Sequence, residues 1–288
     1  MRQAILPAVI ILLTLLGSYA SARELRFAPL PLEDKKIIHE QFQGLAGFLS
    51  GKTGHKLKMV FFRDYAKIIE AFSRDEIDLA YLGPLPYVVL KKQFEAQEPV
   101  VCFRDTHGET SYTCSLVVFE DSGLELNSLQ RVHIGLTQPY STCGYMAVSQ
   151  MLEQANLSID GDGNSFSYAG SHSKAALGVV RGEYDVAGVK TAISKRYSHM
   201  GLKTIAKSTR FPGFALIANT NTVKPEEIAA IQRALLTLAP QASEKDRKLV
   251  SRWGKQFRNG AVTPDNCNYK DVTDALTRIP WPIPGTEQ

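Results

Sequence analysis

Apolar strands and amphipathic helices alternate along the first third of this chain, and this alternation restricts the fold more than any other feature. The predicted elements are, in order, a strand at 24–30, a helix at 33–54 that ends at glycine, a strand at 56–62, a helix at 65–74 capped by Asp64, and a strand at 77–83. Strands separated by helices form a mostly parallel sheet with helices on both faces. The sequence therefore predicts an α/β fold.

A partial internal repeat indicates that this architecture is used twice. Segments 73–83 and 180–190 share four identical residues at one constant offset, which are Arg74/Arg181, Glu76/Glu183, Asp78/Asp185 and Ala80/Ala187. Each segment follows a stretch with apolar residues at helical spacing. Matching residues in a matching helix–turn–strand context favour a duplicated unit over chance. We therefore expect two lobes, each a mostly parallel sheet flanked by helices.

The two lobes are not expected to be consecutive halves of the chain. Residues 115–123 and 213–219 are apolar strands flanked by turn residues, and they bracket the 133–210 region. This pattern predicts two crossover strands that form a hinge, with a cleft between the lobes. We assign residues 23–118 plus 214–288 to lobe 1, and the inserted residues 119–213 to lobe 2.

The N-terminus is typical of an exported protein. Arg2 precedes an apolar stretch that ends in the small-residue site Ala20-Ser21-Ala22, so we predict a signal peptide at 1–22, with cleavage after Ala22. No cysteine lies at the cut, and a lipid anchor is therefore not indicated. The expected product is a monomer in the periplasm. The formal charge of the full chain, +4, is too small and too dispersed to suggest nucleic acid as a partner.

Four cysteines lack the spacing of metal ligands, and the six histidines are dispersed, so we expect neither a metal site nor a cofactor. Cys102 and Cys114 are equidistant from Gly108 in a stretch that reads as two strands around a turn. A disulfide across that hairpin is expected in an oxidising compartment, with two buried thiols as the alternative. Cys143 and Cys267 are expected to be unpaired.

The most informative local motif is the strand-to-helix loop at 138–144. Ser141 is a natural N-cap, and the helix that follows has core spacing. Its first turn presents free N–H groups and the hydroxyls of Ser141 and Thr142, while Gly144 would allow close approach of the backbone. A helix N-terminus at the end of a parallel strand suits an anion. The alternative is a well-capped helix with no ligand.

Other loops add polar groups at predicted helix starts. Residues 170–180 begin a helix with Ser171, His172 and Ser173, and residues 81–88 begin another after a glycine and a proline. Tyr112 lies on a strand beside the loop at 106–110. Several polar helix starts in a two-lobed α/β protein indicate a convergent oxyanion site.

The ordered set of these motifs resembles the periplasmic solute-binding proteins of phosphonate-type ABC importers. The resemblance spans roughly residues 24–275 and is carried by "DYAKIIEAFSRDEIDLAYLGPLPYV", "GETSYTCSLVV", "QPYSTCGYM", "AGSHSKAALGVVRGEYDVAGV" and "STRFPGFALIA". It implies a two-lobed, type II-like binding-protein fold with a ligand between the lobes. It also implies that Ser141 and Thr142 hold phosphonyl oxygens, with His172 and Tyr112 closing over the ligand.

This sequence departs from the family pattern at three positions. Cys143 stands where the family usually has a third hydroxyl donor, and a thiol is a weak donor. Phe214 and Lys190 occupy positions where relatives that bind an aminoalkyl group can carry acids, which argues against an aminoalkyl ligand. Lys190 is either an added charge against a dianion or a solvated surface lysine. Tyr81 is either a ligand contact or a buried core aromatic.

The leading functional hypothesis is an exported binding protein that captures a phosphonate-, phosphite- or phosphate-like oxyanion. It would deliver the oxyanion to an ABC permease with transmembrane and ATPase subunits. A ligand sensor that feeds a membrane receptor is the alternative, since its site would look the same. A thiol enzyme with Cys143 as nucleophile and His172 as base ranks lower, because no acid is placed to orient His172.

Overall fold

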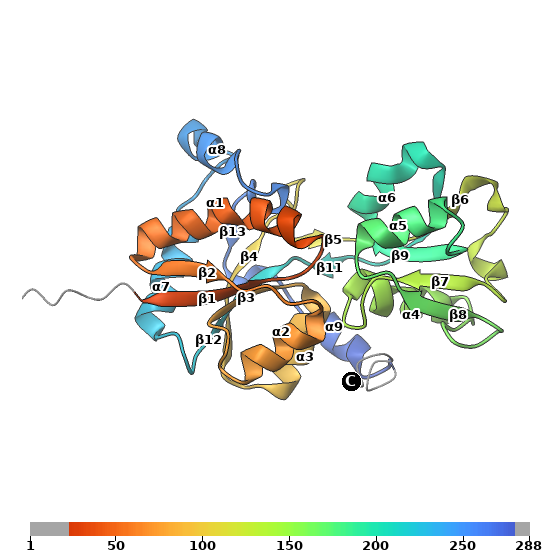
Figure 1. The fold of residues 1–288 in the computed structure, drawn as a ribbon, viewed down its shortest axis with the longest axis horizontal. Helices are drawn as coiled ribbons and strands as arrows, with labels where there is room; N and C mark the ends of the chain where they lie inside the picture. The colour runs from red at the N-terminus through yellow and green to blue at the C-terminus, as the bar shows by residue number, and fades with distance from the viewer. Residues whose placement is uncertain (1–22, 280–288) are drawn as a thin grey trace, which may run out of the picture.

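The computed structural model describes residues 23–279, which form two α/β lobes joined by a pair of short strands (Figure 1). The two-lobed α/β fold predicted from the sequence is confirmed. The predicted signal peptide at 1–22 lies outside the described residues. Among residues 23–279, no helix combines the length and the apolar character needed to cross a membrane.

The sheet of the first lobe has six strands in the order β13-β4-β12-β3-β1-β2. β1 pairs in parallel with β2 and β3, whereas β12 runs antiparallel to β3 and β4, and β13 runs antiparallel to β4. The strands are β1 (Glu24–Pro29), β2 (Lys56–Met59), β3 (Leu79–Leu82), β4 (Gln97–Phe103), β12 (Ala215–Asn219) and β13 (Ala261–Val262).

The sheet of the second lobe has five strands in the order β10-β6-β9-β7-β8. β7 is parallel to β8 and β9, and β6 is antiparallel to β9 and β10. The strands are β6 (Cys114–Phe119), β7 (His133–Leu136), β8 (Ser165–Tyr168), β9 (Val186–Lys190) and β10 (Leu202–Lys207).

Most strands of each sheet run in one direction, as the sequence predicted, but β6 in the second lobe and β12 and β13 in the first lobe run against it. For β6 and β12 the reason is the way the chain passes between lobes. β6 and β12 each enter their sheet directly from the other lobe, at the edge where the parallel strands end. They therefore run opposite to those strands, which are joined by helical crossovers.

The hinge lies at different residues from those predicted. The strands expected to cross between lobes, at 115–123 and 213–219, supply β6 and β12, which lie inside the sheets. The crossing is made instead by β5 (Ser111–Tyr112) and β11 (Phe211–Pro212), which pair antiparallel and lie between the lobes in Figure 1. The boundary expected after residue 118 therefore does not separate the two sheets.

Helices cover both faces of each sheet (Figure 1). In the first lobe α1 packs against α7, and α3 packs against α2 and α9, on the opposite face. In the second lobe α5 packs against α6, and a π-helical turn leads into α4 below the sheet. The helices are α1 (Lys35–Thr53), α2 (Tyr65–Ser73), α3 (Pro84–Gln93), α4 (Ala147–Gln154), α5 (His172–Val180), α6 (Thr191–Tyr197), α7 (Pro225–Leu236), α8 (Glu244–Val250) and α9 (Lys270–Leu276), and the π-helical turn is Thr142–Met146.

The internal repeat has a clear structural basis. β3 and β9 occupy equivalent positions, each between a parallel first strand and an antiparallel strand from the hinge. Asp78 Oδ2 accepts a hydrogen bond from the backbone N–H of Arg26 on β1 at 2.7 Å, and Asp185 Oδ2 accepts one from His133 on β7 at 2.7 Å. Each shared aspartate therefore links equivalent strands by a hydrogen bond, β3 to β1 in the first lobe and β9 to β7 in the second, which confirms a duplicated unit.

The disulfide predicted between Cys102 and Cys114 is wrong, as is the expectation that Cys143 and Cys267 are unpaired. Cys102 on β4 bonds to Cys267 ahead of α9, with Cα atoms 6.3 Å apart. Cys114 at the start of β6 bonds to Cys143 in the π-helical turn, with Cα atoms 5.1 Å apart. The predicted hairpin does not form because β5 lies between Cys102 and Cys114 and carries the chain to the other lobe.

We predict that Cys102→Ala/Cys267→Ala lowers the free energy of unfolding by about 2–5 kcal/mol, because this bridge closes a long loop of the unfolded chain. Urea unfolding of both proteins measures the difference. Peptide mapping of the non-reduced protein should recover the Cys102–Cys267 and Cys114–Cys143 links. A Cys102–Cys114 peptide would contradict this pairing.

Candidate functional site

A small cavity of about 10 Å³ lies between the two lobes. That volume holds about one water molecule. The lining residues come from both lobes and the hinge: Leu30, Leu32, Tyr65, Gly83, Pro86 and Phe214 from the first lobe, Tyr112 from β5, and Ser141, Thr142, Cys143, His172 and Lys190 from the second. The cavity is therefore the place where the predicted motifs meet.

Five helix N-termini converge on this cavity. Its lining includes the first residue or N-cap of each, which are Tyr65 of α2, Gly83 of α3, Ser141 of the π-helical turn, His172 of α5 and Lys190 of α6. The first N–H groups of a helix have no partner inside the helix and carry partial positive charge. The convergence therefore produces a site that favours an anion.

Ser141 caps the turn as the sequence predicted. Its Oγ accepts a hydrogen bond from the N–H of Gly144 at 3.0 Å. The turn is π-helical, and the N–H groups of Tyr145 and Met146 both bond to the carbonyl of Ser141, at 3.0 and 3.3 Å. Gly144 itself does not line the cavity, in contrast to its predicted place. Its missing Cβ makes room for Thr137, whose side chain occupies that space.

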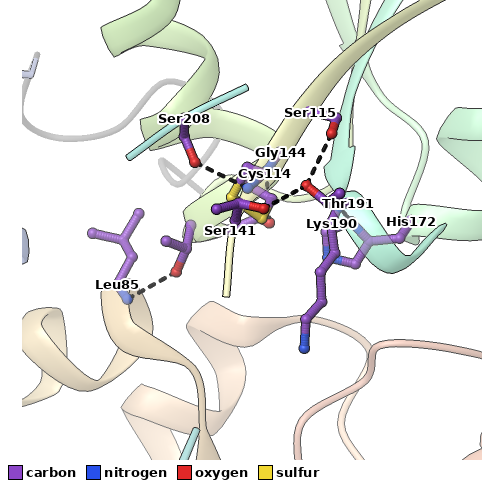
Figure 2. Close-up of a disulfide and its surroundings, with 12 residues drawn as sticks. Leu85, Cys114, Ser115, Ser141, Gly144, His172, Lys190, Thr191 and Ser208 are labelled. Atoms are coloured by element: carbon purple, nitrogen blue, oxygen red, sulfur yellow. Dashed lines mark hydrogen bonds between the residues drawn. A yellow bond between two sulfur atoms is a disulfide. The ribbon is translucent and has the colours of Figure 1, made fainter. Parts of the chain in front are cut away.

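Thr142 connects the lobes. Its Oγ1 accepts a hydrogen bond from the N–H of Leu85, in the first turn of α3, at 3.0 Å (Figure 2). The hydroxyl of Tyr112 also lies beside Thr142. Burial raises the pKa of Tyr112, and the hydrogen bond with Thr142 partly opposes that rise. The Thr142 hydroxyl thus lies where β5, the π-helical turn and α3 meet.

Cys143 cannot have either chemical role considered from the sequence. Its sulfur is bonded to Cys114, so it offers no S–H donor and no thiolate nucleophile. The disulfide instead fastens the π-helical turn to the first residue of β6, directly after the hinge (Figure 2). Cys143 therefore positions the turn.

His172 is a neutral donor. Its Nδ1 accepts a hydrogen bond from the backbone N–H of Lys190 at 3.3 Å. Burial, and then the charge of Lys190, lower the pKa of His172 to about 3. The ring is therefore neutral at physiological pH, and because Nδ1 is an acceptor, its proton is on Nε2.

The side chain of Lys190 faces the cleft, which is one of the two positions considered for it from the sequence. Its ammonium lies 4.5 Å from the ring centroid of Tyr112 and 4.8 Å from that of Phe214. Burial lowers the pKa of Lys190 to about 8, so the ammonium is still charged at neutral pH. Among the described residues that line the cavity, none is an aspartate or a glutamate.

Tyr81, proposed from the sequence as a ligand residue, does not line the cavity. It packs inside the first lobe, edge-on to Phe42 and Phe257, with centroid distances of 5.1 and 5.3 Å. It also stacks on Phe214 at 5.2 Å. Tyr81 therefore packs against Phe214, which does line the cavity.

Gln138 is a structural contact between lobes that the sequence analysis did not identify. Its Oε1 accepts a hydrogen bond from the N–H of Tyr65 at 3.0 Å, and its amide donates to the carbonyls of Pro31 at 3.3 Å and Gly170 at 2.8 Å. The sequence signal was weak, since only its place at the end of a strand marked Gln138. Of the apolar lining residues, Phe214 was singled out in the sequence, whereas Leu30 and Leu32 had no signal beyond their place after a strand.

Comparisons with known proteins agree with this geometry. A family model described as "ABC transporter, phosphonate, periplasmic substrate-binding protein" matches residues 27–269. The chain is 26% identical to the phosphate-import protein PhnD of Mycolicibacterium smegmatis over 217 residues, which cover 70% of this chain and 67% of that protein. It is 27% identical to the phosphonates-binding periplasmic protein of Escherichia coli over 260 residues, which cover 79% of this chain and 74% of that protein.

The fold is also similar to a solved structure. The structure of PhnD1 from Prochlorococcus marinus in complex with methylphosphonate superimposes with a TM-score of 0.76 at 15% identity. The match covers 90% of this chain and all of that one.

We predict that His172 makes the protein sensitive to acid. Between pH 6.5 and about 3 the unfolded chain binds a proton that folded His172 excludes, so the stabilisation is complete above pH 6.5 and is lost as the pH falls. From pH 7 to 5 the wild type should lose about 2 kcal/mol more than His172→Gln in urea unfolding. The exposed His199→Gln is the control and should follow the wild type. Equal losses in wild type and His172→Gln would contradict the prediction.

Proposed function

We propose that this chain, which belongs to the family of periplasmic substrate-binding proteins of phosphonate ABC transporters, captures a small phosphorus oxyanion in the cavity between its lobes. The observation that carries the proposal is the convergence of five helix N-termini on a cavity whose described lining has a lysine and no carboxylate. The names of the relatives support the same ligand class. One is a phosphate-import protein, and another was solved with methylphosphonate.

The binding groups are donors of three kinds. The π-helical turn offers the N–H groups of Thr142 and Cys143 and the hydroxyls of Ser141 and Thr142. His172 offers Nε2–H, since its Nδ1 is occupied by the Lys190 N–H. Tyr112 adds a hydroxyl from the hinge strand. A tetrahedral oxyanion has enough acceptor oxygens to use donors from both lobes at once.

Capture requires the lobes to separate, because a cavity of about 10 Å³ does not admit an oxyanion. Among the described residues, a few polar contacts at the surface join the two lobes. Glu33 accepts a hydrogen bond from the Ser173 hydroxyl at 2.9 Å and pairs with Arg196 at 3.5 Å, and Lys174 lies 3.7 Å from Asp34. Exposed pairs of this kind contribute little each. Opening about β5 and β11 would break these pairs at small cost, would also break the hydrogen bonds of Thr142 with Leu85 and of Gln138 with Tyr65, and would expose the site.

The proposed activity is binding and delivery, with no bond broken in the ligand. Membership of this family implies an ABC permease as the partner. The Cys114–Cys143 disulfide leaves no thiolate for the enzyme considered from the sequence. Both disulfides suit a periplasmic protein, because that compartment is oxidising. We also propose that the chain acts as a monomer.

We predict that Thr142→Val weakens methylphosphonate or phosphate binding by about 1–3 kcal/mol, because a ligand oxygen loses a buried hydroxyl donor. Isothermal titration calorimetry measures the change. Thr142→Ser keeps the hydroxyl and is the matched control, so it should bind within about threefold of the wild type. If Thr142→Val and the wild type bind equally, Thr142 does not contact the ligand. Failure of the wild type to bind any phosphorus oxyanion would overturn the proposed function.

A further inference from the structure

We infer that Lys190 makes the cleft selective for ligands that carry two negative charges and excludes ligands that carry an ammonium group. This inference rests on the proposed function, since it concerns the same cavity. The two charges can both be on the phosphoryl group, or one can be on a carboxylate attached to it. In either case the ligand supplies the negative charge that Lys190 lacks among the described residues of the protein.

The position of the ammonium supports this role. Lys190 is the last residue of β9 and the N-cap of α6, so the strand end directs its side chain into the cleft, toward the first lobe (Figure 2). The ammonium lies over the rings of Tyr112 on the hinge and Phe214 on the first lobe. These rings attract the cation through their faces without neutralising it.

Lys190 forms no ion pair within residues 23–279. Asp105, whose charge raises the pKa of Lys190, lines an adjoining groove of about 350 Å³ on the hinge side, and Lys190 and Tyr112 line that groove as well as the cavity. That groove also contains Glu109, His107, Lys195 and Arg210, and Glu109 pairs with Arg210 at 3.4 Å. The cavity side of Lys190 has only neutral groups, namely His172, tyrosines, hydroxyls and apolar side chains.

A half-buried cation without a partner is unfavourable, and a ligand charge removes that cost. The neutral donors of the helix N-termini and His172 are sufficient to bind one negative charge. A second negative charge gains from Lys190 in a site with little water, where charges interact strongly. An ammonium on the ligand would be repelled by Lys190 and would find no carboxylate in the described lining.

The test uses two pairs of probes in calorimetry at pH 7.5. Methylphosphonate and methanesulfonate have similar shapes, and the second carries only one negative charge. Phosphonoacetate and 2-aminoethylphosphonate carry opposite charges on the substituent. The wild type should prefer methylphosphonate over methanesulfonate and phosphonoacetate over 2-aminoethylphosphonate. The first comparison tests charge on the phosphoryl group, and the second tests charge on the substituent.

The variants remove, keep and reverse the charge. Lys190→Met should weaken methylphosphonate and phosphonoacetate binding about ten- to hundredfold and change methanesulfonate binding less than about threefold. Lys190→Arg should keep the preference for two charges, and Lys190→Glu should bind 2-aminoethylphosphonate more tightly than the wild type. The exposed Lys195→Met, on α6, is the matched control and should bind all four probes like the wild type. Thermal unfolding checks that each variant is folded.

Two outcomes separate this inference from the proposed function. If the wild type binds phosphorus oxyanions but Lys190→Met loses equal affinity for methylphosphonate and methanesulfonate, or loses none, the charge selection by Lys190 is wrong and the proposed function stands. If Lys190→Met does not fold, the test rests on the other two variants. Lys190→Arg should keep the preference for two negative charges, and Lys190→Glu should bind 2-aminoethylphosphonate more tightly than the wild type. Failure of the folded wild type to bind all four probes overturns both.

Discussion

The N–H groups at helix N-termini, which have no partner inside their own helix, are the feature on which the rest of this structure depends. Each lobe places the ends of its parallel strands at the cleft, and each of those strands leads into a helix. The helices therefore begin at the cleft, and their partial positive charges add there. The duplicated unit makes this happen on both sides, since the equivalent strands β3 and β9 lead to helix starts that face the same cavity. Anion binding is thus a consequence of the architecture.

The same groups that would bind an anion join the lobes to each other. The N–H of Leu85 bonds to Thr142, and the N–H of Tyr65 bonds to Gln138. A neutral hydrogen bond of this kind contributes about 0.5–1.5 kcal/mol, whereas a hydrogen bond to a charged group contributes about 1.5–3 kcal/mol. An oxyanion can therefore replace the contact between Thr142 and Leu85 with a net gain. Closure and capture then use one set of donors.

The Cys114–Cys143 disulfide changes what the binding turn can do. The residue that could have been a third hydroxyl donor is instead a covalent link between the turn and the start of β6. The turn loses a donor and gains a fixed position next to the hinge strand. Lys190 then supplies the positive charge of the cavity, held between Tyr112 and Phe214. This chain thus combines a common fold with its own distribution of charge.

Local signals in the sequence determined the helices, the caps and the polar part of the cavity lining. Ser141 and Ser171 cap helices because their short hydroxyls reach the next N–H groups, and that chemistry is visible within a few residues. Tyr112, His172 and Lys190 could be placed near the cleft from their positions at strand and helix ends. The repeat also predicted two similar lobes, since Asp78 and Asp185 make equivalent backbone contacts.

Only the tertiary structure decided which distant residues meet. A disulfide needs two Cα atoms within about 4–7 Å, and sequence spacing does not reveal that β5 carries the chain to the other lobe between Cys102 and Cys114. The burial of Tyr81 behind Phe214 and the contact of Gly144 with Thr137 likewise depend on packing between separate elements. Propensities act over a few residues, whereas these contacts form when sheets, hinge and turns are assembled.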